Sequence, residues 1–323
     1  MQGFWATLPR PFFVLAPLAN VTDVAFRRLI ATYSKPYGPD VMYTEFVSAD
    51  GLIRGNREVL IRDLAFSPSE RPIVAQFFTS SPEAMEEVAT LASELGFDGV
   101  DINMGCPDRA VEKQGAGAAL MKDPKLACAL IEAAQRGAGE LPVSLKTRLG
   151  YNTDMLESWL PALFSCRPAA IVLHARTRKD LSSVPARWER IRQAVEIRDG
   201  MGSQTLLIGN GDVSGMEDAR QKAAETGVDG VMLGRAIFGR PWLFDEGKQP
   251  DLQERLRIAC EHAALFEELL GDIKSFAIMK KHFKAYVEGF PGAKELRATL
   301  METKNASEVR EVIETFLGGI LKE

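Results

Sequence analysis

Short runs of apolar residues recur along the first three quarters of the chain, each followed by a polar loop and a helical pattern. Runs of this length, rich in Val, Ile, Leu and Phe, indicate strands that are buried on both faces. We predict strands at 12–17, 41–46, 72–78, 99–103, 142–147, 169–175, 205–210 and 230–234. Eight such strands separated by helices predict a (β/α)8 barrel. A doubly wound sheet is the alternative, but no GxGxxG motif follows the first strand.

The helices between these strands have clear start and stop signals. In segment 81–96, Ser81 can cap the helix, Pro82 takes its first position and Gly96 can close its end. Segments 125–137 and 215–227 are further helices, and 215–227 also ends on a glycine.

From Asp251 onward the strand-like runs stop. Apolar residues recur there at three- and four-residue steps, which predicts a small antiparallel helical bundle. We predict its helices at 252–271, 274–290, 293–304 and 307–319. The stretch "EGKQPD" reads as a linker, so the expected domains are a barrel of residues 1–246 and a helical domain of residues 251–323.

Composition narrows the class of protein. The chain has 323 residues, of which 46% are hydrophobic and 26% charged, as in ordinary globular proteins. Its four cysteines lack the spacing of a zinc site or disulfide framework, so we expect no metal and a reducing cytoplasm. Segment 11–19 is too short to span a bilayer and has no basic leader, so no membrane association is expected. We expect no obligate protein partner.

The net charge of -5 argues against a general polyanion binder, because non-specific nucleic-acid affinity comes from Lys and Arg. The segment from Lys274 to Lys304, however, contains seven basic residues and only three acidic ones. This segment is either a local nucleic-acid contact or a solvated helix face of mixed charge.

Active sites of barrels lie at the C-terminal ends of the strands. Polar or otherwise useful residues end each predicted strand: Pro17, Glu45, Gln76, Asn103, Lys146, His174, Asn210, and Gly234 with Arg235. Any one of them could be a satisfied rim residue, but the whole set predicts a site.

The loops after the last two strands suggest bound phosphate. They read "GNGDV" (209–213) and "GRAIFGRPW" (234–242), with Arg235 at the start of a short helix. Free backbone N–H groups and a helix N-terminus converge at this place in barrels. The alternative is two tight turns that need glycine for backbone reasons.

Other strand ends suit the ring of a flavin mononucleotide. Lys146 can place a positive charge beside the ring, Gln76 can bond its edge and His174 can donate. Lys146 could instead be the Schiff-base lysine of an aldolase. Cys106 favours the flavin, because a thiol that is protonated at neutral pH can serve as an acid. Gly105 would let the backbone approach a ligand and Pro107 would stiffen the loop.

These residues resemble those of a known family. The segments "APLANVTD" (16–23), "NMGCPDRAVEKQGAGAALMKDP" (103–124), "SLKTRLG" (144–150), "HARTR" (174–178), "GNGDV", "GRAIFGRPWLF" and "KKHFKAYVEGFPGAKELRATL" (280–300) are similar to the bacterial tRNA-dihydrouridine synthases. The resemblance covers about residues 11–315, and the Asn-x-Gly-Cys-Pro block is its most specific part.

The resemblance implies an oxidoreductase that uses FMN, with NADPH or NADH as reductant, to reduce uridines in tRNA. Hydride would go to C6 of the uracil and Cys106 would protonate C5. The implied cofactor-binding residues are Pro17, Leu18, Ala19, Gln76, Lys146, His174, Asn210, Gly211, Asp212, Gly234 and Arg235. The resemblance implies that Asn103 and Arg178 lie on the uracil side, and Arg148 is a further candidate for substrate binding. The helical domain with its basic segment would hold the tRNA, and the candidates there are Lys280, Lys281, Lys284 and Arg297.

Three positions depart from the family's pattern. Asn20 stands where glycine is common, and asparagine tolerates the left-handed backbone. Thr79 replaces a frequent glycine. Segment 179–191 lacks the usual Tyr-x-Gly stretch, so RNA contacts near Arg178 are expected to differ. The net acidity predicts weaker or more salt-sensitive tRNA binding.

Two further readings stay open. One is an FMN barrel that acts on a free pyrimidine or enone, against which the C-terminal helices argue. The other is an RNA-binding protein that has lost catalysis, against which Cys106 and the two glycine-bearing loops argue.

Overall fold

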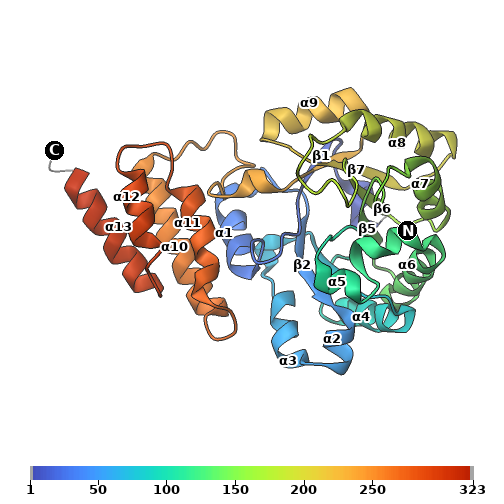
Figure 1. The fold of residues 1–323 in the computed structure, drawn as a ribbon, viewed down its shortest axis with the longest axis horizontal. Helices are drawn as coiled ribbons and strands as arrows, with labels where there is room; N and C mark the ends of the chain where they lie inside the picture. The colour runs from blue at the N-terminus through green and yellow to red at the C-terminus, as the bar shows by residue number, and fades with distance from the viewer. Residues whose placement is uncertain (1–2, 321–323) are drawn as a thin grey trace.

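Eight parallel strands form the centre of the molecule, in a computed structural model that describes residues 3–320 (Figure 1). The strands are β1 (Phe12–Leu15), β2 (Met42–Ser48), β3 (Ile73–Phe78), β4 (Gly99–Asn103), β5 (Val143–Arg148), β6 (Ala170–His174), β7 (Leu206–Asn210) and β8 (Gly230–Leu233). They pair in the order β1-β8-β7-β6-β5-β4-β3-β2. A parallel bridge between Val14 and Val41 joins β1 to the start of β2, which closes the ring. The predicted barrel is confirmed, and the expected strands match with small differences at their ends.

Helices cover the outside of the barrel. They are α1 (Val24–Ser34), α2 (Ala49–Arg54), α3 (Arg57–Leu60), α4 (Pro82–Glu94), α5 (Arg109–Lys113), α6 (Pro124–Ala138), α7 (Leu156–Ser165), α8 (Trp188–Gly200) and α9 (Met216–Thr226). The predicted caps form: the Ser81 side chain accepts a hydrogen bond from the Ala84 amide, and Gly227 ends α9 in the left-handed conformation. A short 3-10 helix, η5 (Arg235–Ile237), follows β8 as expected.

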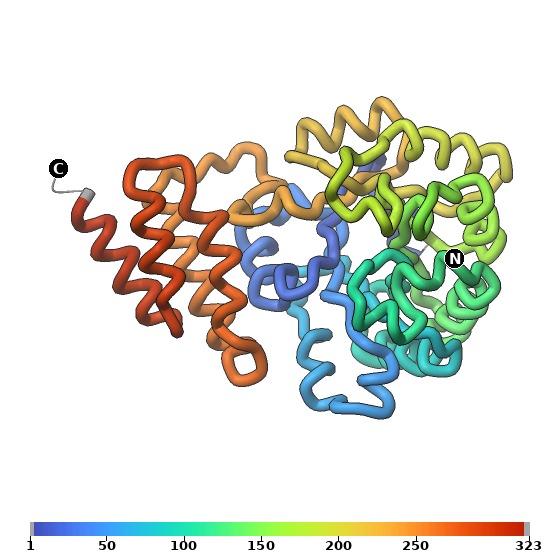
Figure 2. The backbone as a smooth tube through the Cα atoms, in the orientation of Figure 1, coloured from blue at the N-terminus to red at the C-terminus, as the bar shows by residue number. Residues whose placement is uncertain are grey.

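Four helices follow the barrel: α10 (Leu252–Leu270), α11 (Met279–Tyr286), α12 (Ala293–Leu300) and α13 (Ala306–Ile320). Figures 1 and 2 show them side by side at one end of the molecule, with α1 between them and the barrel. The expected helix 274–290 is shorter than its apolar pattern suggested. A 3-10 turn at Phe276–Ile278 precedes α11, and the chain turns at Gly289 (φ 79°) before Pro291.

The junction between the barrel and these helices is aromatic. His262 of α10 stacks on Phe26 of α1, with ring centroids 4.6 Å apart, and His282 of α11 meets both rings. Both histidines are fully buried, and burial lowers the pKa of each imidazole, so both are neutral packing groups. Of the three histidines in the chain, only His174 lies at the barrel mouth.

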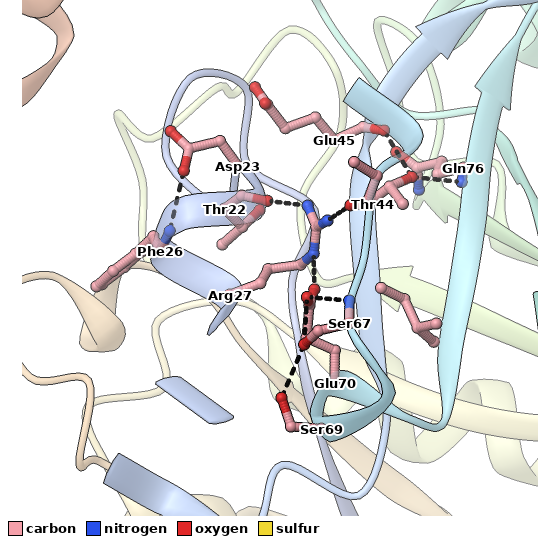
Figure 3. Close-up of polar contacts among 12 residues, drawn as sticks. Thr22, Asp23, Phe26, Arg27, Thr44, Glu45, Ser67, Ser69, Glu70 and Gln76 are labelled. Carbon is pink, nitrogen blue, oxygen red and sulfur yellow. Dashed lines mark hydrogen bonds and ion pairs between the residues drawn. The ribbon is translucent and has the colours of Figure 1, made fainter. Parts of the chain in front are cut away.

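A buried ion pair fixes α1 to the loop before β3 (Figure 3). The Arg27 Nε donates to Glu70 Oε2 at 2.8 Å, and both side chains are fully buried. Its other nitrogens donate to the Thr22 and Ala65 carbonyls at 2.8 and 2.6 Å. Each group is therefore satisfied, and removal of either one would leave a buried charge without its partner.

We expect Arg27→Met to lower the free energy of unfolding by about 3–5 kcal/mol, because the Glu70 carboxylate stays buried without its cation. Urea denaturation of the purified variant measures the change. Arg136→Met is the control, since Arg136 pairs with Glu86 on the surface, where loss of an ion pair costs at most about 1 kcal/mol. Equal losses in the two variants would show that burial of the Arg27 pair does not matter.

Candidate active site

A cavity of about 830 Å³ lies at the C-terminal ends of the strands. Its size is that of a site for a small molecule or cofactor. Every residue predicted to bind the cofactor lines it, together with Cys106, Asn103 and Arg148. The structure thus brings together fourteen of the predicted site residues: Pro17, Leu18, Ala19, Gln76, Asn103, Cys106, Lys146, Arg148, His174, Asn210, Gly211, Asp212, Gly234 and Arg235.

The loop that carries Cys106 is held from three sides. The Asn103 side-chain oxygen accepts hydrogen bonds from the Gly105 and Cys106 amides, at 3.2 and 2.9 Å. The Arg148 Nε donates to the Gly105 carbonyl at 2.7 Å, and the Ala118 amide donates to the Cys106 carbonyl at 3.0 Å. The thiol is therefore presented to the cavity by a rigid backbone.

Two glycines let this loop pack tightly. A Cβ on Gly117 (φ 60°) would lie 2.9 Å from the Cys106 carbonyl oxygen, which explains the glycine at this position of "GAGAAL". A Cβ on Gly105 would lie 3.3 Å from the Thr147 backbone. Gly105 also lines the cavity, so its backbone lies close to both β5 and the cavity.

Behind the loop, a chain of hydrogen bonds crosses the inside of the barrel. Ser144 and Gln76 donate to the two oxygens of Asp101, each at 2.6 Å. The Asn103 Nδ2 then donates to Gln76 Oε1 at 3.1 Å. Burial raises the pKa of Asp101 to about 6, although these bonds and the charge of Lys146 act in the opposite direction. Gln76 and Asn103 are thereby fixed in one orientation each.

Burial also shifts the groups that face the cavity. It lowers the pKa of Lys146 to about 8, and the neighbouring Arg148 acts in the same direction. It raises the pKa of the Cys106 thiol, so this group is protonated at neutral pH. It lowers the pKa of His174, with further lowering by Lys146 and Arg148, so the imidazole is neutral. The cavity therefore holds an acid, a cation and a neutral imidazole.

At the other end of the cavity, Asp212 holds two guanidinium groups. Its Oδ1 accepts from Arg235 at 2.6 Å, and its Oδ2 pairs with Arg176. The Arg176 Nε also donates to the Val184 carbonyl at 2.6 Å. Asp212 is an acceptor here, so it orients the arginines that would meet a phosphate.

Positive charge dominates the lining. Five cationic side chains face the cavity, while Asp212 is the sole carboxylate on the described part of its wall; the cations are Lys146, Arg148, Arg176, Arg235 and Arg240. This concentration stands in contrast to the net charge of -5 of the whole chain. It selects for an anionic ligand.

Sequence reasoning missed Arg176 and Arg240. Arg176 lies two positions beyond His174, and its place in the quoted "HARTR" was the only available signal. Arg240 lies in the loop after β8, and its Nη2 donates to the Ser214 carbonyl at 2.9 Å. Leu181 and Ser182 bring the divergent segment 179–191 to the cavity wall.

The remaining predicted residues lie outside the cavity. Arg178 forms two hydrogen bonds of 2.6 Å with Glu112 of α5, and its guanidinium lies 5.0 Å from the Tyr151 ring centroid. Lys280, Lys281 and Lys284 belong to α11, where Lys281 and Lys284 are exposed. Arg297 of α12 donates to the Val287 carbonyl at 2.8 Å.

The two departures near the cavity have structural explanations. Asn20 has φ 53°, which is the left-handed backbone expected for it. The Thr79 hydroxyl donates to Asp50 at 2.6 Å and accepts from the Ser81 amide at 2.9 Å, so it anchors the turn after β3.

The residues that the structure describes include neither a membrane-spanning helix nor a cluster of metal ligands. No helix between residues 3 and 320 is long and apolar enough to cross a membrane. Among the same residues, no group of three or more His, Cys, Asp or Glu side chains could hold a metal ion.

A parallel barrel with a cationic, thiol-bearing cavity at the C-terminal ends of its strands has the architecture of a barrel enzyme. Solved structures share the fold at low identity. Histamine dehydrogenase from Rhizobium sp. 4-9 superimposes with a TM-score of 0.55 at 13% identity, over 78% of this chain and 48% of that chain. An old yellow enzyme homologue from Zymomonas mobilis superimposes with a TM-score of 0.50 at 14% identity, over 75% of this chain and 90% of that chain.

The chain belongs to the dihydrouridine synthase (Dus) family, whose profile matches residues 14–320. A probable tRNA-dihydrouridine synthase of Staphylococcus epidermidis is 40% identical over 319 residues, which are 98% of this chain and 96% of the relative. Probable tRNA-dihydrouridine synthase 2 of Bacillus subtilis (strain 168) is also 40% identical, over 98% of this chain and 97% of the relative. The resemblance stated from the sequence is thus confirmed.

Proposed function

We propose that this protein reduces the C5=C6 bond of specific uridines in tRNA, with FMN as cofactor and NADPH or NADH as reductant. The observation that carries the proposal is the place of the Cys106 thiol, which a hydrogen-bonded loop presents to a cationic cavity that Lys146 also lines. Burial raises the pKa of this thiol, which suits an acid. The names of the bacterial relatives support tRNA as the substrate. We place the reaction in the cytoplasm.

The residues present fit FMN. The phosphate would meet Arg176 and Arg235 together with the backbone of Gly211 and Gly234. A Cβ on Gly211 (φ 128°) would lie 2.9 Å from Ala186 Cβ, so this turn has room for glycine alone. Lys146 would face the ring, and Gln76 would bond its edge. Bound FMN would supply hydride transfer from the reduced nicotinamide to C6 of the uracil.

The chain's own contribution is the proton. The Cys106 Sγ–H bond breaks as a C–H bond forms at C5, while the hydride completes the C–H bond at C6. The resulting thiolate lies near the positive charges of Arg148 and Lys146, which lower its pKa, and solvent returns its proton. Asn103 and Arg148, which brace the loop, would contact the base on the same side.

The target base must leave the tRNA stack to reach the cavity, so the RNA must be held elsewhere. We assign this role to the helical domain after residue 251, through Lys280, Lys281 and Lys284 of α11 and Arg297 of α12, and to Arg178 in the barrel loop after β6. Exposed lysines on a helix can contact phosphates without reading sequence.

The test compares substrates. Purified protein with FMN and NADPH is incubated with unmodified tRNA or with free uridine, and dihydrouridine is measured by mass spectrometry. We expect product in tRNA alone. Equal reduction of free uridine would favour the free-pyrimidine reading. The lowered pKa of Lys146 also suits a Schiff base, and covalent trapping of a carbonyl substrate by borohydride in a flavin-free protein would favour the aldolase.

A further inference from the structure

The cavity loop of residues 16–20 is held at its end by an acid from a neighbouring strand. The Asn20 amide donates to Glu45 Oε1, and Asn20 has the left-handed backbone that turns the loop. Pro17, Leu18 and Ala19 of the same loop line the cavity. Figure 3 shows the Glu45 side chain extending from β2 over the segment that carries Thr22 and Asp23. The position of the loop therefore depends on where Glu45 is held.

Glu45 is held in turn by Lys274, from the segment that joins the C-terminal helices α10 and α11. Its Oε2 accepts from Lys274 Nζ at 2.7 Å, and the same ammonium contacts Asp63 Oδ1 at 2.7 Å. The Lys274 side chain is 14% exposed and that of Glu45 is 8% exposed. Lys274 lies between α10 and α11, five residues before α11 begins. A short path of direct contacts thus joins these helices to the cavity loop: Lys274, Glu45, Asn20.

Charge makes this path sensitive to Lys274. Glu45 and Asp63 both contact the one ammonium, and Asp23 lies close enough to be affected by both Glu45 and Lys274. Burial raises the pKa of Asp23 to about 6, and the charge of Glu45 adds to this rise. Without Lys274, Glu45 would keep a poorly solvated charge with no cation in contact, so its side chain would move from its present position.

We propose that Lys274 is a positioning residue that, through Glu45, holds the loop of residues 16–20 against FMN and so couples the seating of the C-terminal helices to flavin binding. This inference rests on the proposed function, because it requires FMN in the cavity. Coupling between two binding sites is reciprocal. If tRNA stabilises the helices in this position, it strengthens FMN binding, and FMN strengthens tRNA binding by the same factor.

The first experiment measures the Kd of FMN by the change in flavin fluorescence. We expect Lys274→Met to raise the Kd of FMN about 10-fold, which is within the usual range of coupling between two sites. Lys274→Arg should keep most of the affinity for FMN. Asp272→Asn is the matched control, because it breaks the Arg62–Asp272 ion pair between the same two parts of the molecule and removes none of the contacts that join Lys274, Glu45 and Asn20. Equal weakening in Lys274→Met and Asp272→Asn, or none in either, would overturn the coupling.

A second variant guards against misfolding. In Glu45→Gln, the amide oxygen can still accept from Asn20 while the ion pair is lost, so FMN affinity should fall in part. The double variant should then bind FMN no more weakly than Lys274→Met, because both changes interrupt one path. Additive losses would contradict a shared path.

A third measurement uses only the unmodified protein. The Kd of tRNA is determined by filter binding with and without saturating FMN, and we expect FMN to tighten tRNA at least about 5-fold. Unchanged tRNA affinity would overturn the coupling. A protein that binds no FMN at all would instead refute the proposed function, so the two failures are distinguishable.

Discussion

Replacement of Cys106 by alanine is expected to leave FMN bound and NADPH oxidation close to normal, while dihydrouridine formation falls about 100-fold or more. General acids contribute about 10²–10⁴-fold, and the methyl group of alanine has no proton to give to C5. The loop itself should persist, because its hydrogen bonds come from backbone groups of Gly105 and Cys106 and not from the thiol. Mass spectrometry of tRNA nucleosides measures the product, and stopped-flow absorbance measures reduction of the flavin.

Cys128→Ala serves as the matched control for this variant. Its thiol lies on α6, outside the cavity, and donates to the Ala162 carbonyl at 3.4 Å. We expect its dihydrouridine yield to equal that of the parent protein. If Cys106→Ala also kept the full yield, another group would have to supply the proton, and the role given to Cys106 would be wrong.

Lys146→Ala is expected to weaken FMN binding at least about 10-fold, because it removes one of the two positive charges that β5 places in the cavity, along with the packing of that side chain. The pH dependence gives a second readout. The pKa of Lys146 is about 8, so its charge is present below that pH and is lost as the pH rises through it. In the parent protein, the Kd of FMN should therefore increase above about pH 8.

The variant should lack this step in the pH profile, since alanine does not titrate. Lys122→Ala is the control: Lys122 is exposed, lies 3.7 Å from the Tyr151 ring centroid and does not line the cavity. It should bind FMN with the parent's affinity and pH profile. A parent Kd that stays constant from pH 7 to pH 9.5 would count against Lys146 as the charge beside the flavin.

Local pattern was sufficient for most of the fold. Most of the strands are short apolar runs, because a strand buried on both faces has little polar side to interrupt it, although β5 carries polar residues at four of its six positions. Helix ends followed from Ser81, Gly96 and Gly227, whose preferences act within one turn. The division of segment 274–290 was missed because its apolar spacing continues through residues that the structure places in a 3-10 turn and a loop.

The residues of the candidate site were predicted from their chemical type and from the rule that barrel active sites lie at the C-terminal ends of the strands. Strand ends converge at one mouth, so Gln76, Asn103 and Lys146 could be grouped without knowing any distance. The rule does not say which way a side chain turns beyond the strand. Arg178, two residues after Arg176 in the same loop, therefore pairs with Glu112, while Arg176 faces the cavity.

Taken by itself, the sequence determined the barrel, the C-terminal helices and the set of residues at the mouth, because these depend on periodicity and on chain order. Only the tertiary structure decided which charges meet: Glu112 with Arg178 across 66 positions, and Glu45 with Lys274 across 229. Such pairs carry no local signal. They form because folding removes both groups from water, and a buried charge is stable only where another part of the chain supplies its counterpart.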